Sequence, residues 1–459
     1  MNKIGGALLI TLFQSAVSLV AQLTLARILS PDVFGQFALC SVLVTILMAF
    51  ANLQCDKYII SGKDQTPQER FKASVYVEFL IAIAFFGLAV FVFPIILKLL
   101  HKEELVYYSL ILACSVAYTP FTRSKAVLDS QLKFFKARLP QLIAQTIAAL
   151  VAVYLALNDY GLSALIVWRL CAYSLEVIIL TITYGFPKVK AIEITNVKVM
   201  LNFVRPLYCA AVIFTIYVSF DYYVLATLIS NKELGLYWLS FQLTNYLLIL
   251  KTTFNNILLP YYSQVDDESI KLALLNHHTK LLILFYLSIS TVCMILSGTA
   301  INLILGDEWT DMIPIFNLFT IVVMFKAFIG SFLPYLISVE KRSAELNSTI
   351  CSLMILAVLL PVLSLKIGIF GALLSVMVST LIGFIYLYFK YINRNINGNF
   401  FKTFIGMILA SFFIYGGSLL SIMPKIVILT SILVVVLIIL VRYVKKIRLT
   451  LNQISSINQ

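Results

Sequence analysis

Long apolar stretches separated by short polar linkers run through nearly the whole chain. A helix needs about 20 apolar residues to cross a bilayer, so this pattern predicts an all-α polytopic membrane protein with about 14 transmembrane helices. The linkers, of which the longest lie near 58–72, 187–202 and 261–278, are too short to hold a soluble domain. The predicted segments are 5–29, 35–58, 73–97, 105–126, 139–158, 161–186, 203–228, 235–260, 279–305, 312–338, 346–366, 368–391, 402–422 and 425–443.

One stretch of the chain occurs twice. Leu25 to Leu39, LARILSPDVFGQFAL, returns in altered form as Leu225 to Leu239, LATLISNKELGLYWL, 200 positions later and without a gap. Each copy contains the end of one apolar helix, a short polar turn, a glycine and the start of the next helix. Because the match includes the turn and its glycine, it indicates a duplicated membrane bundle. Two later turns agree, since Gly161 opens the sixth segment and Gly368 opens the twelfth.

The position of the repeat defines the predicted domains. Segments 1 and 2 match segments 7 and 8, so the repeat unit is six helices, and an even number of helices preserves orientation. We therefore predict two pseudo-symmetric six-helix bundles in a parallel repeat, with the substrate path in the cleft between them. The N-terminal bundle is expected at 1–200 and the C-terminal bundle at 201–398, followed at 399–459 by two additional helices and a basic cytoplasmic tail.

The charges give the expected orientation. The chain has 34 Lys and Arg against 21 Asp and Glu, and most of the basic residues fall in linkers on the side of the two termini. The positive-inside rule then places both termini in the cytoplasm. In such a chain a net charge of +13 reflects topology and anionic headgroups rather than nucleic acid. The seven cysteines form no CxxC pair, and we predict no metal site and no disulfide.

Four cations lie within or at the ends of predicted spans and are the candidate substrate-binding residues. A charge that faces lipid costs on the order of 3 kcal/mol, so such residues usually face a bundle interior or a cavity. If these four line the cleft, they form a cationic path that suits a diphosphate. Two alternatives stay open, because the residues near span ends can snorkel to the headgroups and the deeper ones can form structural ion pairs. The four are Arg27, Arg169, Lys251 and Lys326.

Three carboxylates within spans are candidates for coupling transport to an ion gradient. A buried carboxylate can carry a proton or bind sodium. Asp221 is the first candidate because it aligns with Ala21 in the repeat and so breaks the symmetry. Glu78 and Glu176 are the others. The alternative for each is an ion pair with a cation of another helix.

Two short motifs resemble a known family. The stretch LARILSPDVFGQFAL and the stretch Val127 to Lys136, VLDSQLKFFK, are similar to the polysaccharide flippases of the multidrug/oligosaccharidyl-lipid/polysaccharide exporter superfamily. Ser30 departs from the pattern, since the family commonly has glycine there. The resemblance implies two six-helix bundles and a flippase of the bacterial inner membrane. Such a flippase moves a polyprenyl-diphosphate-linked oligosaccharide (undecaprenyl diphosphate is the expected carrier) by alternating access, for O-antigen, lipopolysaccharide, capsule or exopolysaccharide assembly.

The same resemblance implies which partners to expect. They are the lipid-linked oligosaccharide, the lipid bilayer, a polysaccharide polymerase and a chain-length regulator, with no nucleic acid. No catalytic constellation or phosphate-binding glycine loop is present in the sequence, so we predict no enzymatic activity and no cofactor.

Two other functions stay open at this stage. The first is an ion-coupled exporter of drugs or metabolites from the same superfamily. The second is an enzyme, a polysaccharide polymerase or ligase. Such enzymes typically carry a large periplasmic loop, whereas the predicted outer linkers here, including 98–104 and 306–311, are short.

Overall fold

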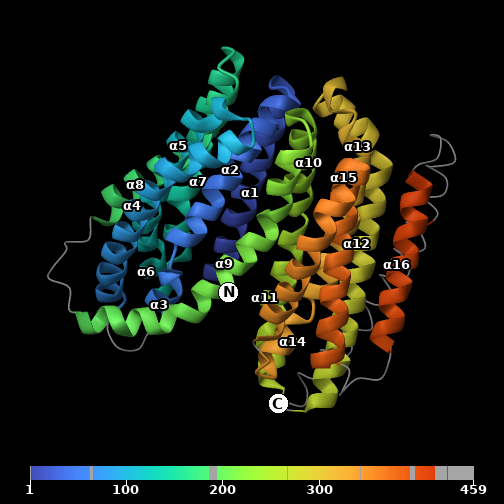
Figure 1. The fold of residues 1–459 in the computed structure, drawn as a ribbon. Coiled ribbons are helices and arrows are strands. Elements are labelled where there is room, and N and C mark those ends of the chain that lie inside the picture. The colour runs from blue at the N-terminus through green and yellow to red at the C-terminus, as the bar shows by residue number, and fades with distance from the viewer. Residues whose placement is uncertain are drawn as a thin grey trace. The chain divides into compact units, whose positions relative to one another are not determined.

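A computed structural model describes residues 2–61, 66–185, 194–265, 267–341, 343–392, 399–418 and 432. The described residues contain helices and no strand, which confirms the all-α prediction (Figure 1). The chain divides into two compact units, residues 1–235 and residues 236–459, and each is described by itself. The six-helix bundles with boundaries at 200 and 398 stay a prediction.

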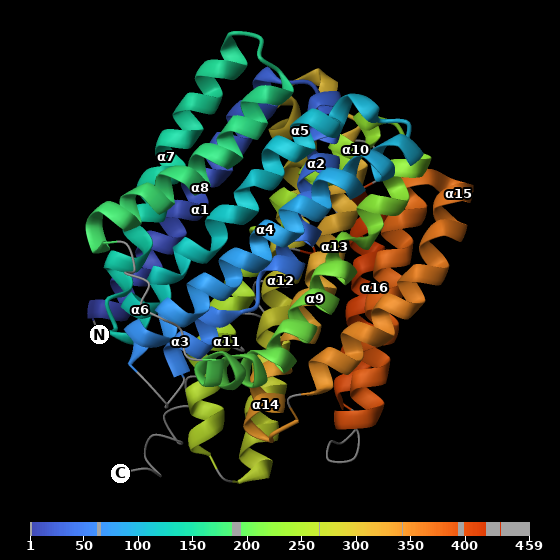
Figure 2. The same ribbon diagram turned by 60° about the vertical axis from the view of Figure 1, so that its left-hand side comes forward.

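The first unit holds nine complete helices among its described residues and the first turn of a tenth. Its helices are α1 (Asn2–Ile28), α2 (Pro31–Ala51), α3 (Cys55–Ser61), α4 (Pro67–Leu99), α5 (Val106–Ala113), α6 (Ser124–Ser130), α7 (Phe134–Leu157), α8 (Leu162–Tyr184), α9 (Ile194–Leu228) and the start of α10 (Asn231–Asn245). Two 3₁₀ helices, η1 (Glu103–Leu105) and η2 (Cys114–Arg123), flank α5. Figure 2 shows α7 and α8 side by side, and both α1 and α8 pack against α7.

Most of the second unit consists of four long helices and two short ones. They are α11 (Leu248–Gln264), α12 (Glu268–Ile304), α13 (Met312–Gly330), α14 (Leu333–Ser338), α15 (Ser343–Leu387) and α16 (Asn399–Ser418). A 3₁₀ turn, Asp307–Trp309, precedes α13, and a π-helical turn, Tyr388–Ile392, follows α15. Helix α13 packs against α12 and α15, and these three lie side by side in both views (Figures 1 and 2).

The predicted segments agree with the helices in most places. Ten helical stretches among the described residues are long and apolar enough to span a membrane. The stretch 343–392 contains two predicted segments, and its backbone leaves the helical conformation at Ile367 and Gly368, where we expect one segment to end and the next to begin. The fourteenth predicted segment, 425–443, lies outside the described residues apart from residue 432. The count of fourteen therefore stays a prediction.

The longest predicted linkers are partly helical, and the last of them shows this most clearly. The stretch 261–278 is helical for most of its length, because α11 continues to Gln264 and α12 begins at Glu268. Asp267 caps α12, with its side chain accepting a hydrogen bond from the Ser269 N–H. The helix that contains the ninth predicted segment, 279–305, therefore begins well before the apolar residues do.

The two copies of the repeat have the same local structure. Helix α1 ends at Ile28 and α2 begins at Pro31, while α9 ends at Leu228 and α10 begins at Asn231, so both boundaries are 200 residues apart. The later turns match as well. Gly161 has φ +49° and ψ −121°, and Gly368 has φ +57° and ψ −135°. This region of backbone space is restricted to glycine, which explains why both turns carry one.

The side chains fit a chain that lies in lipid. In α7, the alanines at 144, 148, 152 and 156 are buried and repeat every four residues, so they form one face along which another helix can approach closely. In unit 2, Phe328, Phe332 and Phe384 pack ring against ring, with centroids 4.8–5.7 Å apart. Large apolar side chains such as Phe91, Leu99, Ile182 and Phe413 are exposed on the helices instead. Bilayer-facing surfaces have this character.

Candidate transport site

In each unit, the second membrane segment of the repeat is interrupted, and a side-chain hydrogen bond joins this segment to the fourth. In unit 1, the break between α2 and α3 at residues 52–54 lies beside the end of η2, where the Arg123 guanidinium donates a hydrogen bond to Asn52. In unit 2, the break between α10 and α11 at 246–247 is followed by Asn255, which donates to the carbonyl of Gly330 at the end of α13 (2.8 Å). An interrupted helix leaves backbone groups that must find partners within the membrane.

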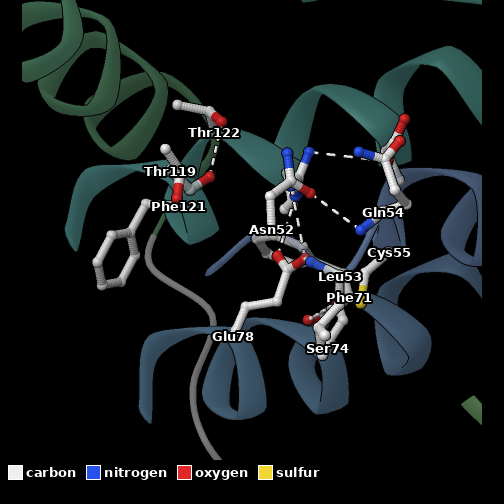
Figure 3. A network of polar contacts seen from close by, with 12 residues as sticks. Asn52, Leu53, Gln54, Cys55, Phe71, Ser74, Glu78, Thr119, Phe121 and Thr122 are labelled. Atoms are coloured by element: carbon white, nitrogen blue, oxygen red, sulfur yellow. Dashed lines mark hydrogen bonds and ion pairs between the residues drawn. The ribbon is translucent and has the colours of Figure 1, made fainter. Parts of the chain in front are cut away.

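In unit 1, Glu78 of α4 provides a hydrogen-bond partner for the backbone at the break between α2 and α3 (Figure 3). Its carboxylate accepts a hydrogen bond from the backbone N–H of Leu53 at 3.1 Å. The next N–H, that of Gln54, donates to the side chain of Asn52 at 2.9 Å. Gln54 itself has φ +60°, in the left-handed region that non-glycine residues rarely adopt. Two side chains, those of Glu78 and Asn52, thus hold the chain in a strained turn.

Arg123 completes this cluster. Its Nε lies 2.9 Å from Glu78 Oε2, and its Nη1 lies 3.7 Å from Asp56 Oδ1. The Glu78 side chain is 1% exposed and that of Arg123 is 13% exposed. The ion pair therefore joins the third and fourth segments directly over the break in the second.

A second ion pair lies nearby in sequence. Lys125 of α6 contacts Glu176 of α8, with Nζ 2.5 Å from Oε1, and the Glu176 side chain is 5% exposed. Two of the three ion-coupling candidates, Glu78 and Glu176, thus have a cation as partner, as the structural alternative requires. Asp221 of α9 is also buried, and its Oδ1 accepts the backbone N–H of Tyr222 at 3.0 Å. The coupling role of all three stays a prediction.

In unit 2, Tyr286 of α12 forms hydrogen bonds with the backbone at the break between α10 and α11, as Glu78 does at the break in unit 1. Its hydroxyl donates to the carbonyl of Leu247 at 2.8 Å and accepts the backbone N–H of Lys251 at 3.1 Å. Glu78 and Tyr286 are both on the third segment of their half and are 208 residues apart, close to the 200-residue offset of the repeat. Neither these two residues nor the breaks at 52–54 and 246–247 are 200 residues apart, so the two arrangements resemble each other without occupying equivalent positions of the repeat.

The Lys251 side chain lies against the end of α13. A Cβ atom added at Gly330 would be 2.6 Å from its Nζ, so the glycine leaves room for the ammonium group. The carbonyls at the end of a helix also favour a cation. Lys326 lies one turn before this end, with its Nζ 5.2 Å from the centre of the Phe241 ring.

The two arginines of the candidate site lie in unit 1. Arg27 is exposed in the last turn of α1, where its charge complements the helix dipole. Arg169 is exposed on α8, and its guanidinium carbon is 5.8 Å from the centre of the Tyr173 ring. The structure thus brings Lys251 and Lys326 to one helix end in unit 2 and places Arg27 and Arg169 on separate helices of unit 1. Substrate contact by the four stays a prediction.

The sequence does not predict which side chains form the hydrogen bonds at the two helix breaks. Arg123, Asn255 and Tyr286 have no feature in the sequence that distinguishes them from other polar residues near span ends. The described residues contain no group of three or more His, Cys, Asp or Glu side chains that could hold a metal.

A family described as "Polysaccharide biosynthesis protein" matches residues 24–314, which is more than half of the chain. The chain belongs to this family. The matched range includes both copies of the repeat and the residues described at both helix breaks except for Lys326 and Gly330. No curated protein sequence matches the chain.

Solved structures share the fold of this family member. A structure titled "Lipid II flippase MurJ, inward closed conformation" matches with a TM-score of 0.73 and 15% identity, covering 95% of this chain and 98% of that one. An inward-facing multidrug resistance MATE transporter of the MOP superfamily matches with a TM-score of 0.62 and 11% identity, over 82% and 94%. An outward-facing MATE transporter matches at 0.54 and 12%, over 84% and 95%. The chain is thus a multi-pass membrane protein that shares the fold of these transporters.

Proposed function

We propose that this family member is a flippase that translocates a polyprenyl-diphosphate-linked oligosaccharide repeat unit across the bacterial inner membrane by alternating access. The product would serve O-antigen, capsule or exopolysaccharide assembly. The proposal includes the orientation from the positive-inside rule, with both termini in the cytoplasm. A polysaccharide polymerase and a chain-length regulator are the expected protein partners.

The observation that carries the proposal is the set of four cations within membrane segments of a polysaccharide biosynthesis protein. A passenger with a diphosphate needs positive charge where water is scarce, and Arg and Lys supply it. The hydrophobic tail of such a lipid stays in the bilayer, so the protein has to shelter the polar part alone. The likeness of the fold to a lipid II flippase and to a MATE transporter agrees with a protein that shelters the polar part of its substrate while the lipid tail stays in the bilayer.

Removal of one deep cation tests the proposal. In a strain that lacks its own surface-polysaccharide flippase and carries the cognate sugar pathway, wild-type protein is expected to restore surface glycan. Arg169→Ala and Lys326→Ala are each expected to lower it at least tenfold, because a diphosphate loses a charge partner worth about 1.5–3 kcal/mol. Lys98→Ala, at an exposed position in the last turn of α4, is the matched control and is expected to behave as wild type.

Each alternative result has a definite meaning. Full activity of both variants would assign those cations to structural roles and leave the function intact. Failure of the wild type, without accumulation of lipid-linked repeat units in the null strain, would favour the ion-coupled exporter of the same superfamily.

The buried Asp221 is the observation that favours ion coupling. Asp221→Asn keeps the size of the side chain and removes its charge. If a proton or sodium gradient drives transport through this residue, the variant is expected to lose gradient-dependent transport while remaining folded. Surface-glycan restoration with and without an uncoupler measures this. Unchanged dependence on the gradient would remove Asp221 from the mechanism.

A further inference from the structure

The two copies of the repeat contact each other at their glycines. A Cβ atom added at Gly35 would lie 1.8 Å from the carbonyl oxygen of Asn231, and one added at Gly235 would lie 1.9 Å from the carbonyl oxygen of Pro31. Positions 31 and 231 are equivalent in the repeat, as are 35 and 235. The first turns of α2 and α10 therefore cross backbone to backbone.

This contact has the form of an isologous interface. Each copy presents the same two positions, and position 35 of one copy meets position 31 of the other in both directions. Residues four apart lie on one face of a helix, so each first turn offers one carbonyl and one glycine to its counterpart. A small residue at such a crossing is what allows two membrane helices to approach closely.

No other side chain fits at either glycine. Real Cβ atoms essentially never come within 3.0 Å of such an oxygen. The neighbouring atom is a backbone carbonyl, which cannot rotate away, so an alanine would force the two helices apart by on the order of 1 Å. Gly330 differs, because the atoms nearest to it belong to the flexible side chain of Lys251.

Other contacts fix the first turn of α10. The Lys102 ammonium, which follows α4, donates a hydrogen bond to the side chain of Asn231 at 2.7 Å. Ser230 and Glu233 form reciprocal hydrogen bonds at the start of α10, the arrangement that caps a helix firmly. Phe34 and Leu234, each next to a glycine of the crossing, are buried. The crossing is therefore close, and both of its glycines are buried.

We propose that the crossing of Gly35 and Gly235 is a latch that closes the transport path at the face of the membrane carrying the α1–α2 and α9–α10 turns, and that it parts and re-forms in each transport cycle. The inference rests on the proposed function. Alternating access in a parallel repeat requires the two halves to separate at each face in turn. A backbone contact between equivalent positions of the two copies is one that such a motion has to break.

Alanine substitutions test the latch. At matched membrane levels, Gly35→Ala and Gly235→Ala are each expected to lower surface-glycan restoration at least tenfold. The double variant is expected to be no worse than either single variant, because one separation of the helices relieves both contacts. Gly87→Ala in α4 is the matched control, since nothing lies within 4 Å of a Cβ there. Wild-type transport by both glycine variants would overturn the proposal.

A cross-linking experiment tests the contact in a protein that keeps both glycines, with Gly35→Ala as the comparison. In a chain whose own cysteines are replaced, Lys102→Cys and Asn231→Cys are joined by a short bifunctional thiosulfonate reagent. Cross-linking is expected to stop transport and a reductant to restore it, while Gly35→Ala slows the cross-linking at least tenfold. Undiminished transport by the cross-linked protein would overturn the latch. Absence of transport before cross-linking, with the cross-link formed as expected, would instead count against the proposed function.

Discussion

Arg123→Met is expected to lower the free energy of unfolding in detergent by about 3–5 kcal/mol, because it leaves the carboxylate of Glu78 charged and buried without its partner. The Glu78 side chain is 1% exposed, so water cannot replace the guanidinium. The variant also removes a hydrogen bond to Asn52 at the break between α2 and α3. Thermal or denaturant unfolding of the purified protein measures the effect.

A control variant at a more exposed ion pair and a double variant test whether the buried charge of Glu78 causes the loss of stability. Arg138→Met breaks the pair with Asp129, whose two side chains are 33% and 14% exposed, and is expected to cost about 1 kcal/mol or less. Glu78→Gln combined with Arg123→Met is expected to recover part of the loss, since position 78 no longer carries a buried charge without its partner. If Arg123→Met were no more costly than Arg138→Met, the Glu78 cluster would not hold the break.

Tyr286→Phe is expected to lower the free energy of unfolding by about 2–4 kcal/mol. The substitution keeps the ring and removes one hydroxyl, which leaves the carbonyl of Leu247 and the N–H of Lys251 without their partner. Each buried group left unsatisfied costs about 1–3 kcal/mol. Faster amide hydrogen exchange at residues 247–251 is expected to accompany the loss of stability.

The control for this prediction is Tyr154→Phe on α7. Tyr154 is 67% exposed, so the same chemical change is expected to alter stability by less than about 0.5 kcal/mol. An effect of Tyr286→Phe as small as that of the control would show that the break between α10 and α11 is held by other contacts.

Apolar length and the repeat predict the helices because both are local properties of the sequence. The matching ends of α1 and α9 follow from the turn that the two copies share, and the break at Gly368 follows from its glycine. The breaks within the second and eighth segments were not predicted. Residues 52–54 and 246–247 contain neither glycine nor proline, and the polar residues Asn52 and Gln54 fall near the end of the second segment, where polar residues are expected in any case.

The cations of the candidate site show a similar limit. Their depth in the membrane follows from counting along a helix, but their partners depend on tertiary packing. Arg123 falls in a basic stretch that the sequence assigns to the cytoplasmic side, yet it pairs with Glu78, 45 residues away. Lys251 is predicted to face a substrate, and the structure places its ammonium against Gly330. A sequence pattern does not indicate that a glycine makes room for a lysine on another helix.

The crossing of Gly35 and Gly235 constrains how this sequence can change. Other equivalent positions have drifted apart, as with Phe37 and Tyr237 or Pro31 and Asn231. The two glycines cannot do so independently, because a side chain at either one pushes against the backbone of the other copy. A gain of bulk at one position cannot be compensated by a loss at its equivalent, which is already the smallest residue. In a saturation library, both positions should therefore accept nothing but glycine, even though neither is predicted to touch the substrate.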